Sequence, residues 1–276
     1  MILVTGATGT VGSAVCTELE GTEHPVRAAV RSPDRFDGPA EEVIEFDFTD
    51  PTTYRETFDG VDSLFLVRPP QLSRVRRDIV PALAAAVGAG VEHVVFLSVI
   101  GADRNPMVPH ARIESWLDDA GVETTYLRAS FFMQNLTTVH REEVLDGELF
   151  VPAGDGATSF VDARDVAVVG ARALTEGLTG AYDLTGPEAL DYHAVAAILS
   201  ATLDHDVRYT NPSLVRFLWR RYRIDRNPSK AAVMAGIYTT ARLGLAGRVT
   251  DDLKTLLGRA PTDFETFTRE HREMWQ

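Results

Sequence analysis

The sequence of 276 residues contains very little lysine. Only Lys230 and Lys254 are lysines among 27 basic residues, and 40 acidic residues give a formal net charge of −13. Such a surface excludes general nucleic-acid binding, which needs clustered positive charge. It is typical of adaptation to high salt (an acidic, halophilic protein), but a GC-rich genome favours arginine codons in the same way, and both explanations stay open.

The chain also lacks paired cysteines and long apolar runs. Cys16 is the single cysteine, which excludes an intramolecular disulfide, and we expect it to pack as a small apolar group. No stretch approaches the roughly 20 apolar residues that cross a bilayer, so no membrane segment is expected. Met1 leads directly into an apolar strand without a signal-like region, which predicts a cytoplasmic location. No metal site is predicted.

The first twelve residues carry the most informative pattern. Residues 2–4 form a short apolar run typical of a buried parallel strand. Gly6, Gly9 and Gly12 follow, and an apolar helical pattern begins directly after them. Glycines at this point permit a sharp turn, close approach of a pyrophosphate to the backbone, and tight packing of the helix on the sheet. The pattern therefore predicts a dinucleotide-binding turn, in preference to an ordinary glycine-rich loop.

Strand and helix patterns alternate along most of the chain, which predicts a Rossmann-type α/β fold with a doubly wound parallel sheet. Residues 1–186 are predicted to form this dinucleotide-binding domain, with 131–160 contributing to a smaller region. Residues 187–276 read as mainly helical and are predicted to cap the substrate. Elements expected within the first domain include a third strand with Val43, Ile44 and Phe46 and one long helix over 75–89. The stretch 160–167 is expected to start a further helix, with Asp162 as its cap.

The loop after the second predicted strand bears on the choice of cofactor. Arg31 stands where sites specific for NAD commonly place an acidic residue, and Arg35 is nearby. An arginine there can hold a 2′-phosphate, so the sequence favours NADPH, with NAD possible as the alternative cofactor. The other interpretation is that both arginines are solvated loop charges.

Taken together, these stretches resemble the NmrA-like branch of the atypical short-chain dehydrogenase/reductases. That branch includes NAD(P)H-dependent quinone reductases, triphenylmethane reductases and cofactor-sensing regulators. The resemblance spans nearly the whole chain and is carried by Val4–Gly12, Val30–Pro33, Phe46–Asp50, Val94–Ser98, His110–Asn135, Phe160–Ala167 and Tyr182–Glu188.

The resemblance implies a set of binding residues. Cofactor contacts are expected from Gly6, Thr8, Gly9, Thr10, Val11, Gly12, Arg31, Asp47, Phe48, Val67, Arg68, Ser98 and Phe131. Asp47 is expected either to accept from the adenine amino group or to fix its own loop. The acceptor, a flat and apolar small molecule, is expected beside Phe131, Phe132 and Asn135. Neither nucleic acid nor a membrane is expected as a partner, and the oligomeric state is open.

One departure from related enzymes bears on mechanism. Short-chain dehydrogenases that handle alcohols use a tyrosine four residues before a lysine, and neither lysine here has that spacing. In a related branch a lysine stands at the position of His110, and a histidine can donate a proton near neutral pH. His110 is thus the candidate catalytic residue, against the alternative of a helix-start histidine. Glu114, one turn later, either orients it or faces solvent.

These features predict direct hydride transfer from NADPH to a quinone-like or otherwise electrophilic acceptor. An electron-poor acceptor needs chiefly a well-held nicotinamide, since water can protonate its oxygens. The alternative function is a redox sensor that binds the dinucleotide without catalysis. An epimerase or dehydratase is disfavoured because it normally needs the missing tyrosine.

Overall fold

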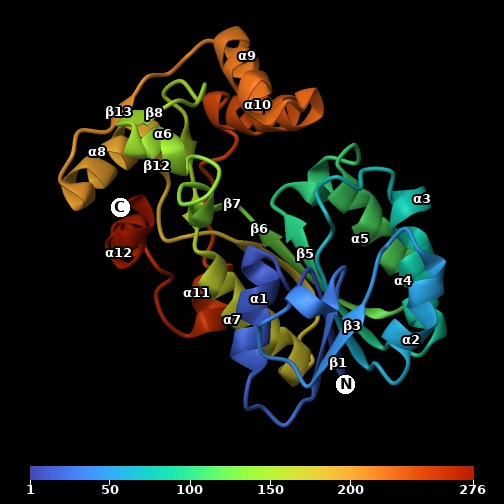
Figure 1. Cartoon of the computed structure of the whole chain (residues 1–276). Helices are drawn as coiled ribbons and strands as arrows, with labels where there is room; N and C mark the ends of the chain where they lie inside the picture. Colours follow the sequence, from blue (N-terminus) through green and yellow to red (C-terminus); the bar gives the residue numbers. More distant parts are fainter. The chain divides into compact units, whose positions relative to one another are not determined.

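The computed structural model describes all residues, 1–276, and divides them into two compact units (Figure 1). The first unit comprises residues 1–129 and 163–184, and the second comprises 130–162 and 185–276. The sequence predicts this division at Gly186, with residues 131–160 contributing to the smaller region. The chain thus leaves the first unit once and returns to it for one helix and one strand.

A seven-stranded parallel sheet forms the centre of the first unit. Its order is β11-β6-β5-β4-β1-β2-β3, so the winding direction reverses between β1 and β4. This is the doubly wound Rossmann-type topology that the sequence predicts, and ligands of such sheets bind at the carboxyl ends of the strands near the reversal. The strands are β1 (Ile2–Thr5), β2 (Val26–Val30), β3 (Glu42–Glu45), β4 (Ser63–Leu66), β5 (His93–Val99), β6 (Glu123–Ala129) and β11 (Gly180–Leu184).

Helices cover both faces of this sheet. They are α1 (Thr10–Leu19), α2 (Tyr54–Phe58), α3 (Val75–Asp78), α4 (Val80–Gly88), α5 (Pro109–Ala120) and α7 (Ala163–Glu176). In Figure 1, α1 and α7 pack together on one face, and α2, α4 and α5 lie on the other. Gly170 lets α7 approach the sheet, because a Cβ there would lie 2.9 Å from the Phe65 ring. Cys16 is buried on α1 as expected, and burial raises the pKa of its thiol to about 11.

Three local predictions need correction. The long helix expected over 75–89 is two helices, α3 and α4, because Pro81 has no N–H to continue a helix and instead stands in the first turn of α4. Phe46 lies just beyond β3, where its ring packs against Phe48 and Phe58. Residues 160–161 form a strand rather than a helix start, and α7 begins directly after Asp162.

The second unit is mainly helical. Its helices are α6 (Arg141–Leu145), α8 (Tyr192–Leu203), α9 (Leu214–Asp225), α10 (Pro228–Arg242), α11 (Asp252–Leu257) and α12 (Phe264–Glu270). Its short strands are β7 (Phe131–Phe132), β8 (Glu148–Leu149), β9 (Ala157–Thr158), β10 (Phe160–Val161), β12 (Leu190–Asp191) and β13 (Arg208–Tyr209). The core is aromatic, with the buried rings of Phe160, Tyr192, Phe217, Tyr238 and Phe264.

A buried polar cluster joins three helices of the second unit. His140 contacts Glu143 through Nδ1 at 2.7 Å and the Tyr238 hydroxyl through Nε2 at 2.5 Å. Arg221 donates to the other oxygen of Glu143 at 3.2 Å. These contacts hold α6, α9 and α10 together and pair the buried charges of Glu143 and Arg221, although Nε of Arg221 is buried without a hydrogen-bond partner. None of the helices combines the length and the apolar character needed to span a bilayer.

Candidate functional site

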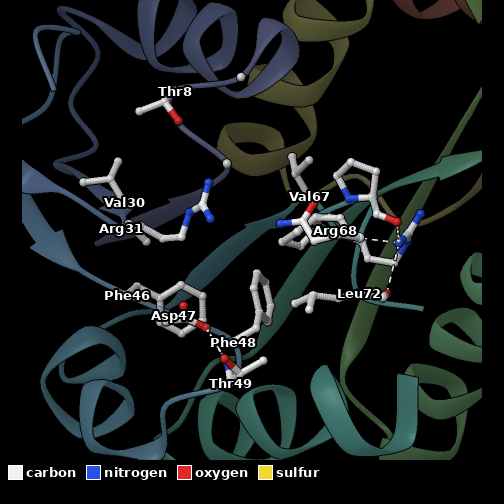
Figure 2. Close-up of a pocket in the computed structure, with 16 residues that line it drawn as sticks. Thr8, Val30, Arg31, Phe46, Asp47, Phe48, Thr49, Val67, Arg68 and Leu72 are labelled. Carbon is white, nitrogen blue, oxygen red and sulfur yellow. Dashed lines mark hydrogen bonds between the residues drawn. The ribbon is translucent and has the colours of Figure 1, made fainter. Parts of the chain in front are cut away.

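A pocket of about 390 Å³ opens at the carboxyl ends of β1, β2, β3 and β4 in the first unit (Figure 2). This is the edge of the sheet beside the reversal in strand order, where the topology predicts a ligand. The pocket is lined by Gly6, Thr8, Gly9, Ala29, Val30, Arg31, Phe46, Asp47, Phe48, Thr49, Val67, Arg68, Pro69, Pro70, Gln71 and Leu72.

The glycine turn forms one wall of the pocket. Gly6 has a φ of 64°, in the left-handed region, and its carbonyl accepts from the N–H of Gly9 at 2.8 Å. A Cβ at Gly12 would lie 2.2 Å from the same carbonyl oxygen, so only glycine lets α1 start this close to the turn. No side chain caps the first turn of α1. Its free N–H groups therefore remain available to an anion.

Arg31 extends from the end of β2 into the pocket. Figure 2 shows its guanidinium pointing between Thr8 and Phe48. It forms no ion pair, whereas the nearby Asp47 is committed to its own loop: one carboxylate oxygen accepts from the N–H and the hydroxyl of Thr49, both at 2.7 Å. The loop-fixing role expected for Asp47 is thus present, and Arg31 is left as an uncompensated cation on the pocket wall.

The loop after β4 forms the opposite wall. Arg68 folds back on this loop, and its Nη1 donates to the carbonyls of Pro69, Pro70 and Leu72 at 2.8, 3.1 and 3.0 Å. Its Nε is buried without a hydrogen-bond partner, and burial lowers the pKa of Arg68. Two prolines and three hydrogen bonds make this wall rigid, and they hold a positive charge at the pocket edge without a carboxylate partner.

His110 stands in the first turn of α5, half-buried, with its ring stacked on Phe96 at 5.8 Å. Burial, and then the charge of Arg68, lower the pKa of His110 to about 4. Both effects disfavour the imidazolium near neutral pH, which counts against the proton-donating role expected of this side chain. The neutral ring keeps one N–H that can donate a hydrogen bond. A role for His110 in catalysis stays a prediction.

Glu114 neither faces solvent nor contacts His110. It is buried and accepts from the Ser98 hydroxyl at 2.5 Å and from Arg128 at 2.7 and 3.1 Å. This arrangement also occupies the hydroxyl of Ser98, which was expected to contact the cofactor. Ser98 does not line the pocket, because its side chain points to α5 instead.

The pocket brings together eight of the predicted cofactor residues: Gly6, Thr8, Gly9, Arg31, Asp47, Phe48, Val67 and Arg68. Thr10, Val11 and Gly12 lie directly behind the glycine turn at the start of α1. Phe131, Phe132 and Asn135 belong to the second unit, and their contacts with cofactor or acceptor stay predictions.

The loop of Arg68, Pro69 and Pro70 lines the pocket, at the side where the sequence places the nicotinamide. The lining residues not expected from the sequence are Ala29, Val30, Phe46, Thr49, Gln71 and Leu72. Their position in the chain could have indicated them. These residues lie at or beyond the carboxyl ends of parallel strands, the edge at which a doubly wound sheet binds its ligands.

The sequence of this chain is similar to known proteins over most of its length. A model of the NmrA-like family matches residues 1–220. The chain belongs to the NmrA-like family. Among its relatives is an NAD(P)H azoreductase of Xenophilus azovorans, 33% identical over 98% of this chain and 98% of that protein. Another is (4-alkanoyl-5-oxo-2,5-dihydrofuran-3-yl)methyl phosphate reductase of Streptomyces griseus, 32% identical over 99% of this chain and 98% of that protein.

The fold of this chain is shared by solved structures of reductases. The NADPH-dependent quinone oxidoreductase QOR2 of Escherichia coli, complexed with NADPH, superposes with a TM-score of 0.87. It is 26% identical, and the match covers 98% of this chain and 99% of that one. The family and the Rossmann-type fold expected from the sequence are both confirmed.

Proposed function

We propose that this chain is an NAD(P)H-dependent oxidoreductase that prefers NADPH and reduces flat, electron-poor acceptors such as quinones. The single observation that carries the proposal is the pocket itself, where a glycine turn, an uncapped helix start and the unpaired Arg31 meet at the sheet reversal. The relatives support it, because they include an azoreductase, a quinone oxidoreductase and a reductase of a conjugated furanone.

The residues present fit a phosphorylated dinucleotide. The backbone of residues 6–9 and the first turn of α1 would hold the pyrophosphate, since Gly12 leaves no Cβ to push the helix from the turn. Arg31 would hold the 2′-phosphate, because its guanidinium has no competing carboxylate. When bound, the reduced nicotinamide supplies a hydride.

The chain's own residues position the bound ligands and polarise them, and they do not exchange protons with them. Arg68 is fixed by three carbonyls, so its positive charge is already oriented before any ligand arrives, and it favours negative charge in the pocket. His110 is neutral at pH 7 and can donate one N–H bond without losing a proton. Protons for a reduced acceptor then come from water, which suffices for an electron-poor acceptor.

Turnover and binding measured on the same preparation test this proposal. NADPH oxidation is followed by absorbance with 1,4-benzoquinone, a naphthoquinone and an azo dye, and uncatalysed reduction is subtracted using heat-unfolded protein. Turnover with at least one acceptor supports an oxidoreductase. Tight NADPH binding without turnover across the panel contradicts it and favours the redox sensor. Failure to bind NADPH contradicts both functions.

A further inference from the structure

A second cavity of the first unit lies between α3 and α5 and shares no residue with the pocket described above. It measures about 650 Å³, within the range of roughly 300–1,000 Å³ typical of small-molecule sites. Arg74, Arg76 and Arg77 contribute from the start of α3, and Arg112 contributes from α5. In a chain with a net charge of −13, four arginines around one cavity concentrate positive charge in one place.

The arginines of this cavity are only partly neutralised. Arg77 pairs with Asp78 at 2.5 Å, and the field of Arg74 also helps to keep the pKa of Asp78 low. Arg76 and Arg112, one from each wall, form no ion pair, and Arg112 donates only weakly to the Pro106 carbonyl at 3.4 Å. Asp119 is the single carboxylate in the lining. The cavity therefore keeps an excess of positive charge.

An aromatic surface lies beside these cations. Trp116 lines the cavity one helical turn after Arg112, so both side chains lie on the same face of α5. The indole is half-buried and packs against the core of the unit, which fixes its orientation. A fixed aromatic face next to unpaired guanidinium groups suits a ligand that carries both a planar ring and an anionic group.

We propose that this cavity binds a small aromatic anion, with its ring against Trp116 and its sulfonate or phosphate held by Arg76 and Arg112. The sequence alone suggested that Arg74, Arg76 and Arg77 form a solvated face. Arg112 and Trp116 change that interpretation, because they supply a second basic wall and a stacking surface that a solvated face does not need.

Three ligands with the same ring system test the proposal: 2-naphthalenesulfonate, 1-naphthyl phosphate and the neutral 2-naphthalenemethanol. Each is titrated at low ionic strength into the full chain, with and without saturating NADP⁺, so that the result does not depend on occupancy of the first pocket. Indole N–H signals locate the ligand, since Trp219 and Trp275 belong to the second unit and a Trp116→Phe variant assigns the remaining signal.

The matched variants are Arg76→Gln/Arg112→Gln and the control Arg55→Gln, which removes an exposed arginine of α2 outside the cavity. We expect the anions to shift the Trp116 signal and to bind at least tenfold more tightly than the neutral alcohol. The double variant should weaken anion binding by roughly tenfold or more, as expected for lost charge-assisted contacts. Arg55→Gln should leave it unchanged. The affinity ratio of the two anions then identifies sulfonate or phosphate as the preferred group.

Several results would overturn the proposal. One is that the neutral alcohol binds as tightly as the anions. Another is that the Trp116 signal does not move when an anion is added. A third is that Arg55→Gln weakens anion binding as much as the double variant does. If the anions do not bind and the double variant instead turns an oligomer into a monomer by light scattering, the cavity is a contact between copies of the chain rather than a ligand site.

Discussion

At the residue scale, Arg31 and His110 differ from other ionisable side chains because neither has an ion-pair or hydrogen-bond partner. Most arginines with a fixed position in this chain are held by carboxylates or carbonyls, as Arg128 is by Glu114. Arg31 has no such partner and lines the pocket. Neither ring nitrogen of His110 has a hydrogen-bond partner, and its ring lies in the field of Arg68. Arg31 is therefore free to meet a ligand in the pocket, whereas His110 is half-buried and does not line it.

Replacing Arg31 with alanine should change cofactor preference. NADPH affinity is expected to fall roughly 10- to 100-fold, the effect of losing one or two hydrogen bonds to a charged group, while NADH affinity stays nearly constant. Calorimetric titration with both dinucleotides measures this. Arg35→Ala is the control, since Arg35 lies in the same loop but outside the pocket lining. An unchanged preference in Arg31→Ala would remove Arg31 from cofactor recognition.

His110 should make stability depend on pH in a defined window. Its pKa is about 4 in the folded chain against 6.5 ordinarily, so the unfolded state binds the proton more readily. The free energy of unfolding should therefore fall as pH drops from 6.5 toward 4. The contribution is roughly 2 kcal/mol after allowing for partial exposure of the ring.

The comparison with His110→Phe isolates this contribution, because all carboxylates titrate alike in both proteins. Urea unfolding at pH 7.5 and 4.5 should show a larger loss of stability in the wild type. An identical loss in both proteins would mean that the histidine is solvated. If NADPH oxidation is unaltered in His110→Phe, the side chain has no role in turnover.

At the scale of elements, the start of α1 is fixed by the close approach of Gly12 to the Gly6 carbonyl. Gly12→Ala places a methyl group 2.2 Å from that oxygen, so α1 must move away from the turn. We expect destabilisation by about 1–3 kcal/mol and a loss of at least tenfold in NADPH affinity. Gly88→Ala is the matched control, because a Cβ there meets nothing within 4 Å on α4. Equal effects of the two substitutions would show that the close approach does not matter.

Glu114 joins three elements, α5, β5 and β6, through Ser98 and Arg128. Glu114→Leu should cost about 3–5 kcal/mol, because it leaves the largely buried guanidinium of Arg128 without its main partner. The double variant Glu114→Leu/Arg128→Leu should recover at least half of that loss in urea unfolding. If the single and double variants are equally unstable, the ion pair is not what joins these elements.

At the scale of the whole molecule, local patterns predicted most of the first unit. The run at residues 2–4 and the glycines after it specify a strand, a turn and a helix without help from distant residues. The pocket lining around Arg31 and Asp47 follows from the same rule, because parallel strands deliver their loops to one edge of the sheet.

The remainder depends on contacts that local sequence does not encode. Residues 160–161 look helical in isolation, yet they pair with 131–132 as a strand. Glu114 looks like a surface residue at helical spacing, and only the fold brings Ser98 and Arg128 to it. The low pKa of His110 likewise depends first on its burial in the fold and then on Arg68, which is more than forty residues earlier in the chain.

The central claim is that the glycine-turn pocket binds NADPH, and direct titration of the purified full chain tests it best. Isothermal calorimetry should show one NADPH per chain, bound more tightly than NADH. Absence of binding by either dinucleotide, at every salt concentration in which circular dichroism shows the chain folded, would contradict the account.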